Sequence, residues 1–307
     1  MKQRTATACQ MERPVARCVR NGPERLLPSC EYGMMNIIVC VKQVPDTVEV
    51  EIDRETNTLI REGVDGVINP FDLYAVEEAL CLRDQYGGTV TALSMGLPQV
   101  VAALRETISL GVDNAVLLSD RAFAGADTLA TSYALARGIR TIGRFDLVIC
   151  GRQAIDGDTA HVGPELAEWL GVPHVGCVRR IREVTDGCMI TERVTEDGLE
   201  RIKLPLPGLI TVAKGINEPR FPTLKGMMRA MRSEIPIWSA QDVAANVSRV
   251  GLKGSPTRVV RTFTPDHHRR GEILEGTPEE QVTGLLCRLR KAALLQEGTP
   301  SGPTRHP

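Results

Sequence analysis

The fold is decided by the stretch Phe145-Asp-Leu-Val-Ile-Cys-Gly-Arg-Gln-Ala-Ile-Asp-Gly-Asp-Thr-Ala-His-Val-Gly-Pro-Glu165. Its first part, Phe145–Cys150, is short and apolar, which is typical of a strand buried on both faces of a parallel sheet. At the other end, Pro164 suits the first position of a helix and Glu165 places an acid in the first turn. Ligands of open α/β sheets bind beyond the carboxyl ends of the strands, where helix N-termini can face phosphates. The stretch therefore predicts a loop at the ligand edge of a sheet.

The polar loop within this stretch carries groups that suit a nucleotide. Its glycines allow close approach of the backbone, and its aspartates and threonine can accept hydrogen bonds from ribose or adenine groups. These residues are Gly151, Gly157, Gly163, Asp156, Asp158 and Thr159. The loop has neither Gly-Lys-Ser/Thr nor Gly-x-Gly-x-x-Gly, which excludes a Walker-type grip and a Rossmann-type turn. On spacing alone, a ligand cradle and an ordinary solvated loop are equally supported.

The composition bounds the class of protein. With 307 residues, 42% of them hydrophobic, the chain can bury the core of one large domain, with or without an appended arm. A net charge of -1 argues against nucleic acid or anionic membranes as partners, and no apolar run approaches the ~20 residues that a spanning helix needs. Nine cysteines without a Cys-x-x-Cys pair favour reduced thiols. We expect a globular cytoplasmic protein with no nucleic-acid partner and no direct membrane insertion.

The chain divides into four predicted segments. Residues 1–34 are rich in Arg and Pro without a sustained apolar period, which predicts a disordered N-terminal extension; an upstream start codon explains it as well as targeting does. Residues 35–235 are predicted to form an α/β nucleotide-binding domain with a β-ribbon insertion. Residues 236–297 are predicted to form a C-terminal arm that contacts a partner subunit, and residues 298–307 a disordered tail.

Strand and helix patterns alternate through the first half of the chain. Strands are predicted at 36–41, 89–95, 115–118 and 145–150, and helices after Asp72, at 100–110 and at 128–142. Asp72 and Asp127 are predicted to cap two of the helices. Val48–Asp53 alternates apolar and acidic residues, which predicts an exposed hairpin strand. Such alternation predicts an α/β fold with a doubly wound, mainly parallel sheet.

The pattern changes in the second half. Three strand-like pieces, 189–195, 200–204 and 208–212, fit a β-ribbon with a turn at 196–198. A later apolar stripe at helical spacing favours a core position, although Met is also common on surfaces that accept varied partners. This stripe comprises Leu224, Met227, Met228 and Met231. The chain ends in an amphipathic helix, with Val282, Leu285, Leu286, Leu289 and Leu294 on its apolar side, which we expect to pack on a partner subunit.

Several kinds of site are not supported by the residues. The five histidines have no metal-ligand spacing with Cys or carboxylates, and no Gly-x-Ser-x-Gly elbow is present. Asp156 and Asp158 could act as acid and base, but turn formation explains them better. We therefore predict no catalytic residue and no metal, and interpret the chain as a binder of a nucleotide or nucleotide cofactor that supplies the chemistry.

The opening loop and three further motifs resemble one known family, the electron transfer flavoprotein β subunit. They are Val41-Lys-Gln-Val-Pro-Asp-Thr47, Asn69-Pro-Phe-Asp72, Ala126-Asp-Thr-Leu-Ala-Thr-Ser132 and Gly151–Glu165. The resemblance spans residues 35–295 approximately. A second signature, Arg193-x-x-Glu-Asp-Gly-x-Glu-x-x-x-x-Pro-x-Pro-Gly-Leu-Ile-Thr211, lies in the predicted ribbon. Long motifs in the same order make this resemblance far more specific than any one of them.

The resemblance implies a heterodimer with an α subunit that carries FAD. In ordinary members the β subunit holds a structural AMP, and in electron-bifurcating members it holds a second FAD. The motifs here are similar to the bifurcating group, which includes acyl-CoA systems and the nitrogen-fixation Fix complex. The expected function is to pass electrons from NADH to a low-potential ferredoxin or flavodoxin and to an acyl-CoA dehydrogenase or quinone reductase. The alternatives are a non-bifurcating carrier with AMP and a stand-alone adenine-nucleotide sensor.

The resemblance also implies site residues. Helix-start N–H groups at Thr128 and around Gly163, with the Thr131 and Thr159 hydroxyls, suit an FAD diphosphate. Arg152 would tune a flavin if it lay over the ring, whereas a solvated or backbone-bonded Arg152 would not. The region Arg220–Arg229, with Leu224, resembles the loop that docks partner dehydrogenases, and His161 departs from the usual Gln. The implied cofactor-binding residues are Cys40, Asn69, Pro70, Phe71, Asp72, Met95, Asp127, Thr128, Thr131, Arg152, Gln153, Ala154, Ile155, Asp156, Gly157, Asp158, Thr159, Ala160, His161, Val162, Gly163 and Pro164.

Overall fold

A computed structural model describes residues 34–46, 66–185, 187–260 and 271–295. The chain forms two compact units, Met1–Thr262 and Phe263–Pro307. The predicted hairpin strand Val48–Asp53, the N-terminal extension up to residue 33 and the tail 298–307 lie outside the described residues. None of the described helices combines the length and the apolar character that crossing a membrane requires.

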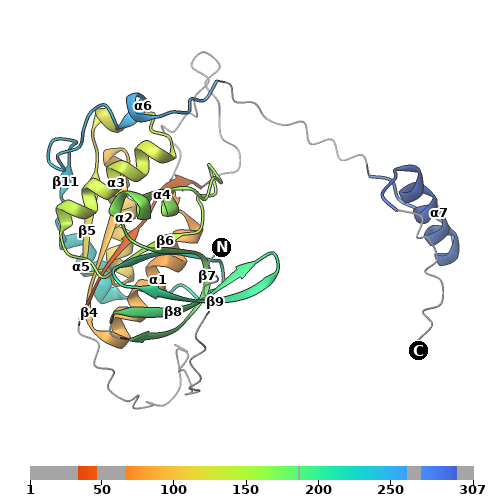
Figure 1. The fold of residues 1–307 in the computed structure, drawn as a ribbon, viewed down its shortest axis with the longest axis horizontal. Coiled ribbons are helices and arrows are strands. Elements are labelled where there is room, and N and C mark those ends of the chain that lie inside the picture. The colour runs from red at the N-terminus through yellow and green to blue at the C-terminus, as the bar shows by residue number, and fades with distance from the viewer. Residues whose placement is uncertain (1–33, 47–65, 186, 261–270, 296–307) are drawn as a thin grey trace, which may run out of the picture. The chain divides into compact units, whose positions relative to one another are not determined.

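The first unit is built on a nine-stranded sheet with the order β11-β5-β4-β1-β6-β10-β7-β8-β9 (Figure 1). The strands from β11 to β7 are parallel, and β7, β8 and β9 form an antiparallel ribbon. A separate antiparallel pair joins β2 to β3. The strands are β1 (Met35–Cys40), β2 (Gln43–Pro45), β3 (Gly66–Ile68), β4 (Gly88–Met95), β5 (Asn114–Leu118), β6 (Leu147–Gly151), β7 (His174–Thr185), β8 (Cys188–Thr195), β9 (Gly198–Pro205), β10 (Gly208–Val212) and β11 (Ile237–Trp238).

Helices cover both faces of the parallel part of the sheet. Side chains of α1 and α2 share one buried cluster with Ile37 and Val39 of β1, and side chains of α3 and α4 share the other with Ile38 and Cys40. This alternation follows from the period of two along a strand. The helices of this unit are α1 (Pro70–Tyr86), α2 (Val101–Leu110), α3 (Thr128–Ile142), α4 (Val162–Leu170), α5 (Leu224–Arg232) and the short α6 (Gly251–Gly254). The predicted doubly wound α/β fold is confirmed.

The strand order creates a switch point between β1 and β6. From β1 the chain crosses through α1 to β4 and through α2 to β5, on one side of β1. Helix α3 then returns the chain to β6, on the other side of β1. The loops that leave β1 and β6 therefore diverge to opposite faces. Ligands of doubly wound sheets bind in the crevice that this divergence leaves outside the carboxyl ends of the two strands.

Two predicted helix caps turn out differently. Asp127 caps α3, because its Oδ1 accepts the N–H of Ala130 at 3.0 Å. The prediction for Asp72 is wrong: α1 begins at Pro70, with Asn69 at the N-cap position, and Asp72 lies in the first turn. Proline explains the earlier start, since its fixed φ suits the first helical position and its missing N–H is not needed there. The buried Asp72 carboxylate is free for another partner.

The predicted ribbon needs one correction. Strands β8 and β9 pair through a turn that contains Glu196 and Asp197, as expected. Strand β10, however, leaves the ribbon and inserts between β6 and β7, parallel to both. All five of its residues are buried, which explains why its run Gly208–Val212 shows no apolar and polar alternation. The third strand of the ribbon is instead β7, whose residues 178–185 pair antiparallel with β8.

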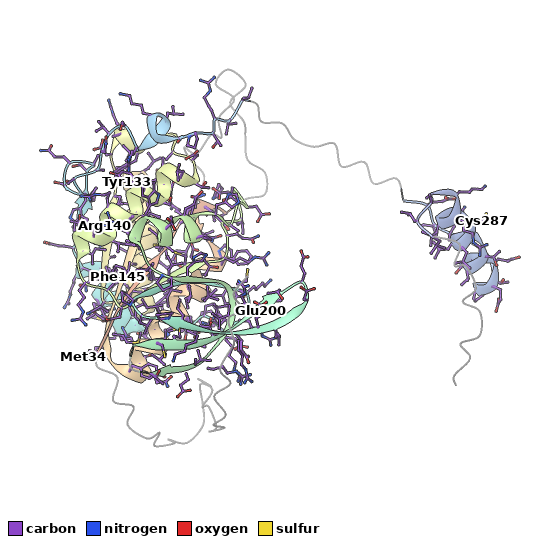
Figure 2. All side chains as sticks on the ribbon, in the orientation of Figure 1. Met34, Tyr133, Arg140, Phe145, Glu200 and Cys287 are labelled. Carbon is purple, nitrogen blue, oxygen red and sulfur yellow. The ribbon has the colours of Figure 1, made fainter. Side chains whose placement is uncertain are left out.

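Residues 237–255 belong to the first unit and pack on its sheet and on α3. Strand β11 pairs with β5, and Ala240, Val243 and Val250 are buried in the same cluster as α3. The guanidinium of Arg249 lies 5.6 Å from the ring centre of Trp169 and 6.0 Å from that of Tyr133, which Figure 2 labels. The predicted boundary between the α/β domain and the C-terminal arm, at residues 235 and 236, stays a prediction. The first part of the predicted arm, residues 237–255, contributes to the α/β core.

The second unit contains α7 (Pro278–Lys291). Thr277 and Glu280 form a capping box at its start, with acids in the first turn and Arg288, Arg290 and Lys291 in the last. Its apolar residues Val282, Leu285 and Leu286 are exposed within the described part of the chain.

Candidate functional site

Asp72 joins the two strands at the switch point. Its Oδ2 accepts the N–H of Lys42, just after β1, at 2.8 Å. A Cβ at Gly151, at the end of β6, would overlap Asp72 Oδ1 and come within 2.9 Å of the Asp72 nitrogen. Only glycine fits at this point. The first turn of α1 is therefore wedged between the carboxyl ends of β1 and β6.

Burial gives the Asp72 carboxyl an unusual charge equilibrium. Desolvation raises its pKa to about 7, although hydrogen bonds from Lys42 and Asn69 and the Lys42 charge act in the opposite direction. The thiols below it are also buried: Cys40 is aligned with Cys150 across β1 and β6. A hydrogen bond with Cys40 and burial raise the pKa of the Cys150 thiol well above its usual value. The crevice floor is thus buried, its Cys150 thiol is neutral at neutral pH, and its Asp72 carboxyl changes charge near pH 7.

Asn69 anchors the polar loop to the start of α1. Its Nδ2 donates to the carbonyl of Gln153 at 2.8 Å, and its Oδ1 accepts the N–H of Ile155 at 3.2 Å. Its own N–H donates to the carbonyl of Lys42 at 2.8 Å. With 1% exposure, Asn69 is a buried amide that uses both ends of its side chain. The loop after β6 is therefore held in place by an Asn that follows β3.

The loop closes on itself and then turns sharply. The N–H of Asp158 donates to the carbonyl of Ala154 at 2.8 Å, and Gln153 Nε2 donates to the Asp158 carboxylate. Asp158 and Ala160 both have left-handed backbones, with φ of 52° and 56°. A left-handed backbone conformation at a non-glycine residue costs about 1 kcal/mol or more of folding free energy. Strained residues of this kind are common at ligand-binding sites. Thr159 lies exposed between them.

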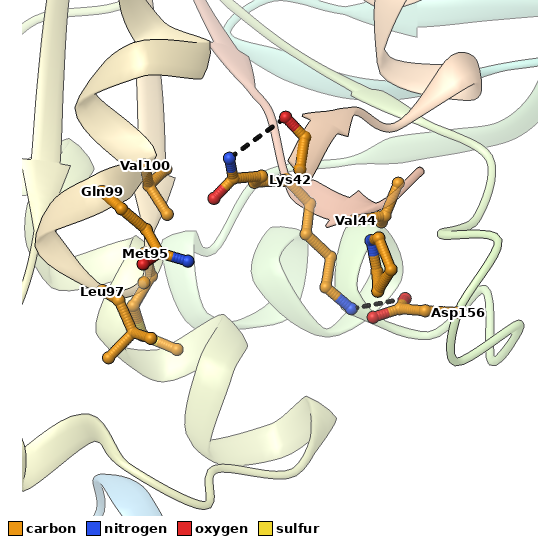
Figure 3. A pocket seen from close by; sticks show the side chains of 11 residues that line it. Lys42, Val44, Met95, Leu97, Gln99, Val100 and Asp156 are labelled. Atoms are coloured by element: carbon orange, nitrogen blue, oxygen red, sulfur yellow. Dashed lines mark hydrogen bonds and ion pairs between the residues drawn. The ribbon is translucent and has the colours of Figure 1, made fainter. Parts of the chain in front are cut away.

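Lys42 reaches the same loop from β1. Its Nζ lies 2.7 Å from Asp156 Oδ1, and the Asp156 side chain is only 12% exposed. Figure 3 shows this pair on one side of an open hollow, with Met95, Leu97 and Gln99 on the other. The sequence interpretation missed this residue because it searched the loop itself for a lysine. Its position directly after the first strand is the signal that could have found it, since that is the ligand edge of the sheet.

The starts of α3 and α4 form the other part of the site. Thr128 Oγ1, at the first position of α3, donates to Glu165 Oε1 in α4 at 3.1 Å. Asp127 directs its second carboxylate oxygen to the N–H and hydroxyl of Thr257, so its carboxylate holds structure together. In the first turns of both helices some N–H groups lack an intrahelical acceptor, as at any helix start. These are the N–H groups of Thr128, Leu129, Val162 and Gly163.

Comparison with known proteins assigns the chain to a family. The sequence profile described as electron transfer flavoprotein domain matches residues 56–243. The chain belongs to the electron transfer flavoprotein family. It is 51% identical over 262 residues to the electron transfer flavoprotein subunit beta of Thermoanaerobacterium thermosaccharolyticum, which covers 85% of this chain and 100% of the relative. The family resemblance of the motifs is confirmed, and the chain corresponds to a β subunit.

Two further relatives of the electron transfer flavoprotein family carry more specific names. The caffeyl-CoA reductase-Etf complex subunit CarD of Acetobacterium woodii is 47% identical over 263 residues, 85% of this chain and 100% of the relative. Protein FixA of Azorhizobium caulinodans is 47% identical over 238 residues, 75% of this chain and 85% of the relative. All of these alignments cover most of both chains. They place this chain among electron-transfer subunits. Because it corresponds to a β subunit, its expected partner is an α subunit.

Within this electron transfer flavoprotein chain, the predicted cofactor-binding residues fall into two groups. Cys40, Met95 and the Asn69–Asp72 turn lie at the carboxyl ends of β1 and β4 and at the start of α1, and the Arg152–His161 loop is joined to them by Asn69. The Thr128 group and Val162–Pro164 lie at the starts of α3 and α4. Arg152 donates its N–H to Val212 and is exposed. Leu224 lies apart from both groups, on α5 beside α2.

The donor set of this electron transfer flavoprotein chain fits an adenine nucleotide. Two helix starts offer N–H groups, Thr131 and Thr159 offer hydroxyls, and the loop is open beside Gly157, where an added Cβ would meet no atom within 4 Å. Glu165, which the sequence interpretation did not include, belongs to this region because one carboxylate oxygen is buried without a partner among the described residues. The sequence offers no reason to include Glu165, because an acidic residue in the first turn of a helix is already explained by its favourable interaction with the helix dipole.

Proposed function

We propose that this chain binds FAD at the switch point between β1 and β6 and acts, with an α subunit that carries its own FAD, in electron bifurcation. The complex would take electrons from NADH. It would pass one to a low-potential ferredoxin or flavodoxin, and the other to an acyl-CoA dehydrogenase or quinone-reductase-type flavoprotein. The observation that supports this most is the anchored, strained loop at the switch point, which leads into the start of α4, itself bonded to the start of α3.

The residues divide the work of binding. N–H groups at the starts of α3 and α4 would hold phosphates, and the Thr159 hydroxyl would contact the ligand from the loop. Asn69 and Gln153 keep the loop in its bound shape before the ligand arrives, which lowers the ordering cost of binding. Bound FAD would supply the redox chemistry, by accepting a hydride and releasing electrons singly. The chain itself contributes position and a low-dielectric floor.

The loop sequence favours FAD over AMP in this proposal. Gly157-Asp158-Thr159 is the version similar to bifurcating relatives, and the names of two relatives, a caffeyl-CoA reductase-Etf complex subunit and FixA, agree with that group. Gly157 is exposed and an added Cβ there would meet no atom within 4 Å, so the space beside it does not restrict the ligand to the size of AMP. The alternative, a non-bifurcating carrier with structural AMP, uses the same donors and differs in what fills that space.

Two exposed apolar surfaces suit the partners of this proposal. The α7 stripe, defined by Val282, Leu285 and Leu286, would belong to a C-terminal arm on the α subunit. The α5 apolar face would dock the partner flavoprotein, and it comprises Phe221, Leu224, Met227, Met228 and Met231, all exposed. That exposure shows that the prediction of a core position for the Met stripe is wrong.

We place the complex in the cytoplasm.

The test is a matched pair of variants at Thr159 in the purified αβ complex. Thr159→Ser keeps the hydroxyl, whereas Thr159→Ala removes it without leaving a buried protein group unpaired. We expect Thr159→Ala to weaken FAD binding at the β site about two- to tenfold, the value of one hydrogen bond, and Thr159→Ser to bind normally. The measurement is FAD titration of complex from which the β-site nucleotide has been removed. Equal affinity of the two variants would remove Thr159 from the site.

A further inference from the structure

Helix α5 exposes its large apolar side chains and buries only Ala230 among its nine residues. Leu224 is 72% exposed and Met231 81%. On the opposite side, a Cβ at Gly226 would overlap the carbonyl oxygen of Ser109, so α5 lies directly on α2. Arg229 donates from the same side to the carbonyls of Ile108 and Val112, at 3.0 and 2.6 Å. The close approach at Gly226, the Arg229 bonds and the burial of Ala230 therefore fix the helix with the α5 apolar face toward solvent.

The segment that leads into α5 has no regular structure, and α1 holds it. Between β10 and α5, residues 213–223 form turns and extended chain. Arg220 donates through its N–H and Nε to Glu77 Oε2, at 3.0 and 2.8 Å, and through Nη2 to Glu77 Oε1 at 3.2 Å. Both Nη groups also reach Asp84 Oδ2 at 3.1 Å. Asn217 adds bonds to Tyr74 and Glu78.

The Glu77–Arg220 pair is built for fixed geometry. The side chains are 6% and 16% exposed, so the pair is largely shielded from water. Two parallel bonds between guanidinium and carboxylate define direction as well as distance, which a lysine cannot reproduce. Burial lowers the pKa of Arg220, but the two carboxylates outweigh burial and raise it, so the arginine stays charged. Flexible surface pairs lack these properties.

We propose that Glu77 and Arg220 are positioning residues that set the placement of the α5 apolar face for the docking of a partner flavoprotein. The proposal rests on the docking role given to that face above. Helix α1 has 17 residues and so spans about 25 Å, and its N-cap residue Asn69 and first-turn residue Asp72 belong to the candidate nucleotide site. One rigid helix thus holds the nucleotide loop at one end and, through Glu77 and Asp84, the docking segment further along.

The experiment measures electron transfer from the intact αβ complex to a purified acyl-CoA dehydrogenase, with a small dye as a second acceptor that needs no docking surface. The variants are Glu77→Gln and Arg220→Lys. We expect the KM for the dehydrogenase to rise about fivefold or more in both, with kcat, dye reduction and flavin content unchanged. Amide hydrogen exchange in residues 217–232 should quicken in the same variants, because the segment loses its anchor.

Two control variants separate the possible failures. Glu192→Gln removes a buried carboxylate with two arginine partners on the ribbon and should leave the KM unchanged. Leu224→Ala removes a side chain of the α5 apolar face itself and should raise the KM. If Leu224→Ala has no effect, the docking role of α5 fails. If only Leu224→Ala raises the KM, the positioning role is overturned. Loss of flavin or of assembly in both Glu77→Gln and Arg220→Lys would also overturn it, because the pair would then hold the fold.

Discussion

Asp72 is the residue at which the two sides of the crevice meet, and its chemistry follows from that place. It accepts the N–H of Lys42 and lies against Gly151, so the end of β1, the start of α1 and the end of β6 converge on one carboxyl group. Burial makes the charged form expensive, which is why its pKa rises to about 7. The carboxyl group keeps the crevice together at the cost of a pH-sensitive charge.

A pH dependence of stability follows from this pKa. An acid with a raised pKa binds more protons in the folded state, so its contribution to the free energy of unfolding falls as pH rises from about 4 to about 7. The loss is at most about 4 kcal/mol, from about three pKa units. We expect Asp72→Asn to lose less free energy of unfolding between pH 5 and pH 8 than the unmodified chain, in urea unfolding. Glu78, whose pKa burial also raises to about 7, titrates in both proteins and cancels. Equal losses in the two proteins would exclude Asp72 as the source.

Single site residues were predictable where a motif surrounded them and unpredictable where a contact crossed the sheet. Asn69 was placed in the site by its motif, yet its two bonds to the loop join residues 84 and 86 positions apart. Lys42 and Asp156 are 114 positions apart. Local sequence patterns cannot predict such pairs, because the two residues come together only when the strands are arranged in the sheet.

At the scale of elements, the packing of α4 on β10 sets the position of one helix start. A Cβ at Gly163 would overlap Thr211 Cγ2, so the first turn of α4 approaches the sheet closely. Thr211 also accepts the N–H of Cys177 through its hydroxyl at 3.1 Å. The N–H groups offered by α4 therefore depend on a contact between glycine and threonine.

This contact predicts a rescue. Gly163→Ala should lower the free energy of unfolding by about 1–3 kcal/mol, the usual cost of overpacking. Thr211→Ser deletes the clashing methyl group and keeps the hydroxyl for Cys177, so Gly163→Ala with Thr211→Ser should recover much of the loss. Gly157→Ala is the matched control, since an added Cβ there meets no atom within 4 Å. Thermal and urea unfolding measure all four proteins. A double variant no more stable than Gly163→Ala would contradict the packing argument.

Elements themselves were largely predictable, but their pairing was not. The helix at 128–142 was predicted with its boundaries and with Asp127 as cap, because the cap and the apolar period are local signals. Strand β10 was assigned to the ribbon because it follows β9 closely. Its five residues are all buried and show no apolar and polar alternation from which a pairing partner could be predicted. Its place between β6 and β7 depends on the order of the whole sheet.

At the scale of the whole molecule, the chain exposes apolar surface in both of its units. The α5 apolar face lies in the first unit and the α7 stripe in the second. Contiguous exposed apolar residues on a folded protein mark interaction sites. A subunit that meets an α subunit through one surface and a partner flavoprotein through another accounts for both.

The α7 stripe can be tested in the full chain. Leu285→Glu places a charge where an apolar contact with the α subunit is proposed. We expect the affinity for the α subunit to fall about tenfold or more, because buried interface anchors carry most of the binding energy. Thermal unfolding of the chain without its partner should change little, because Leu285 is an exposed side chain. Glu279→Gln, at the exposed start of α7, serves as the control. Unchanged affinity in Leu285→Glu would exclude the stripe from the interface.

The most direct test of the central claim is to count the nucleotides released by denaturation from the purified αβ complex. The claim is that the crevice between β1 and β6 holds FAD. The account predicts two FAD and no AMP for each αβ pair. One FAD with one AMP would contradict it and make the chain a carrier with a structural nucleotide.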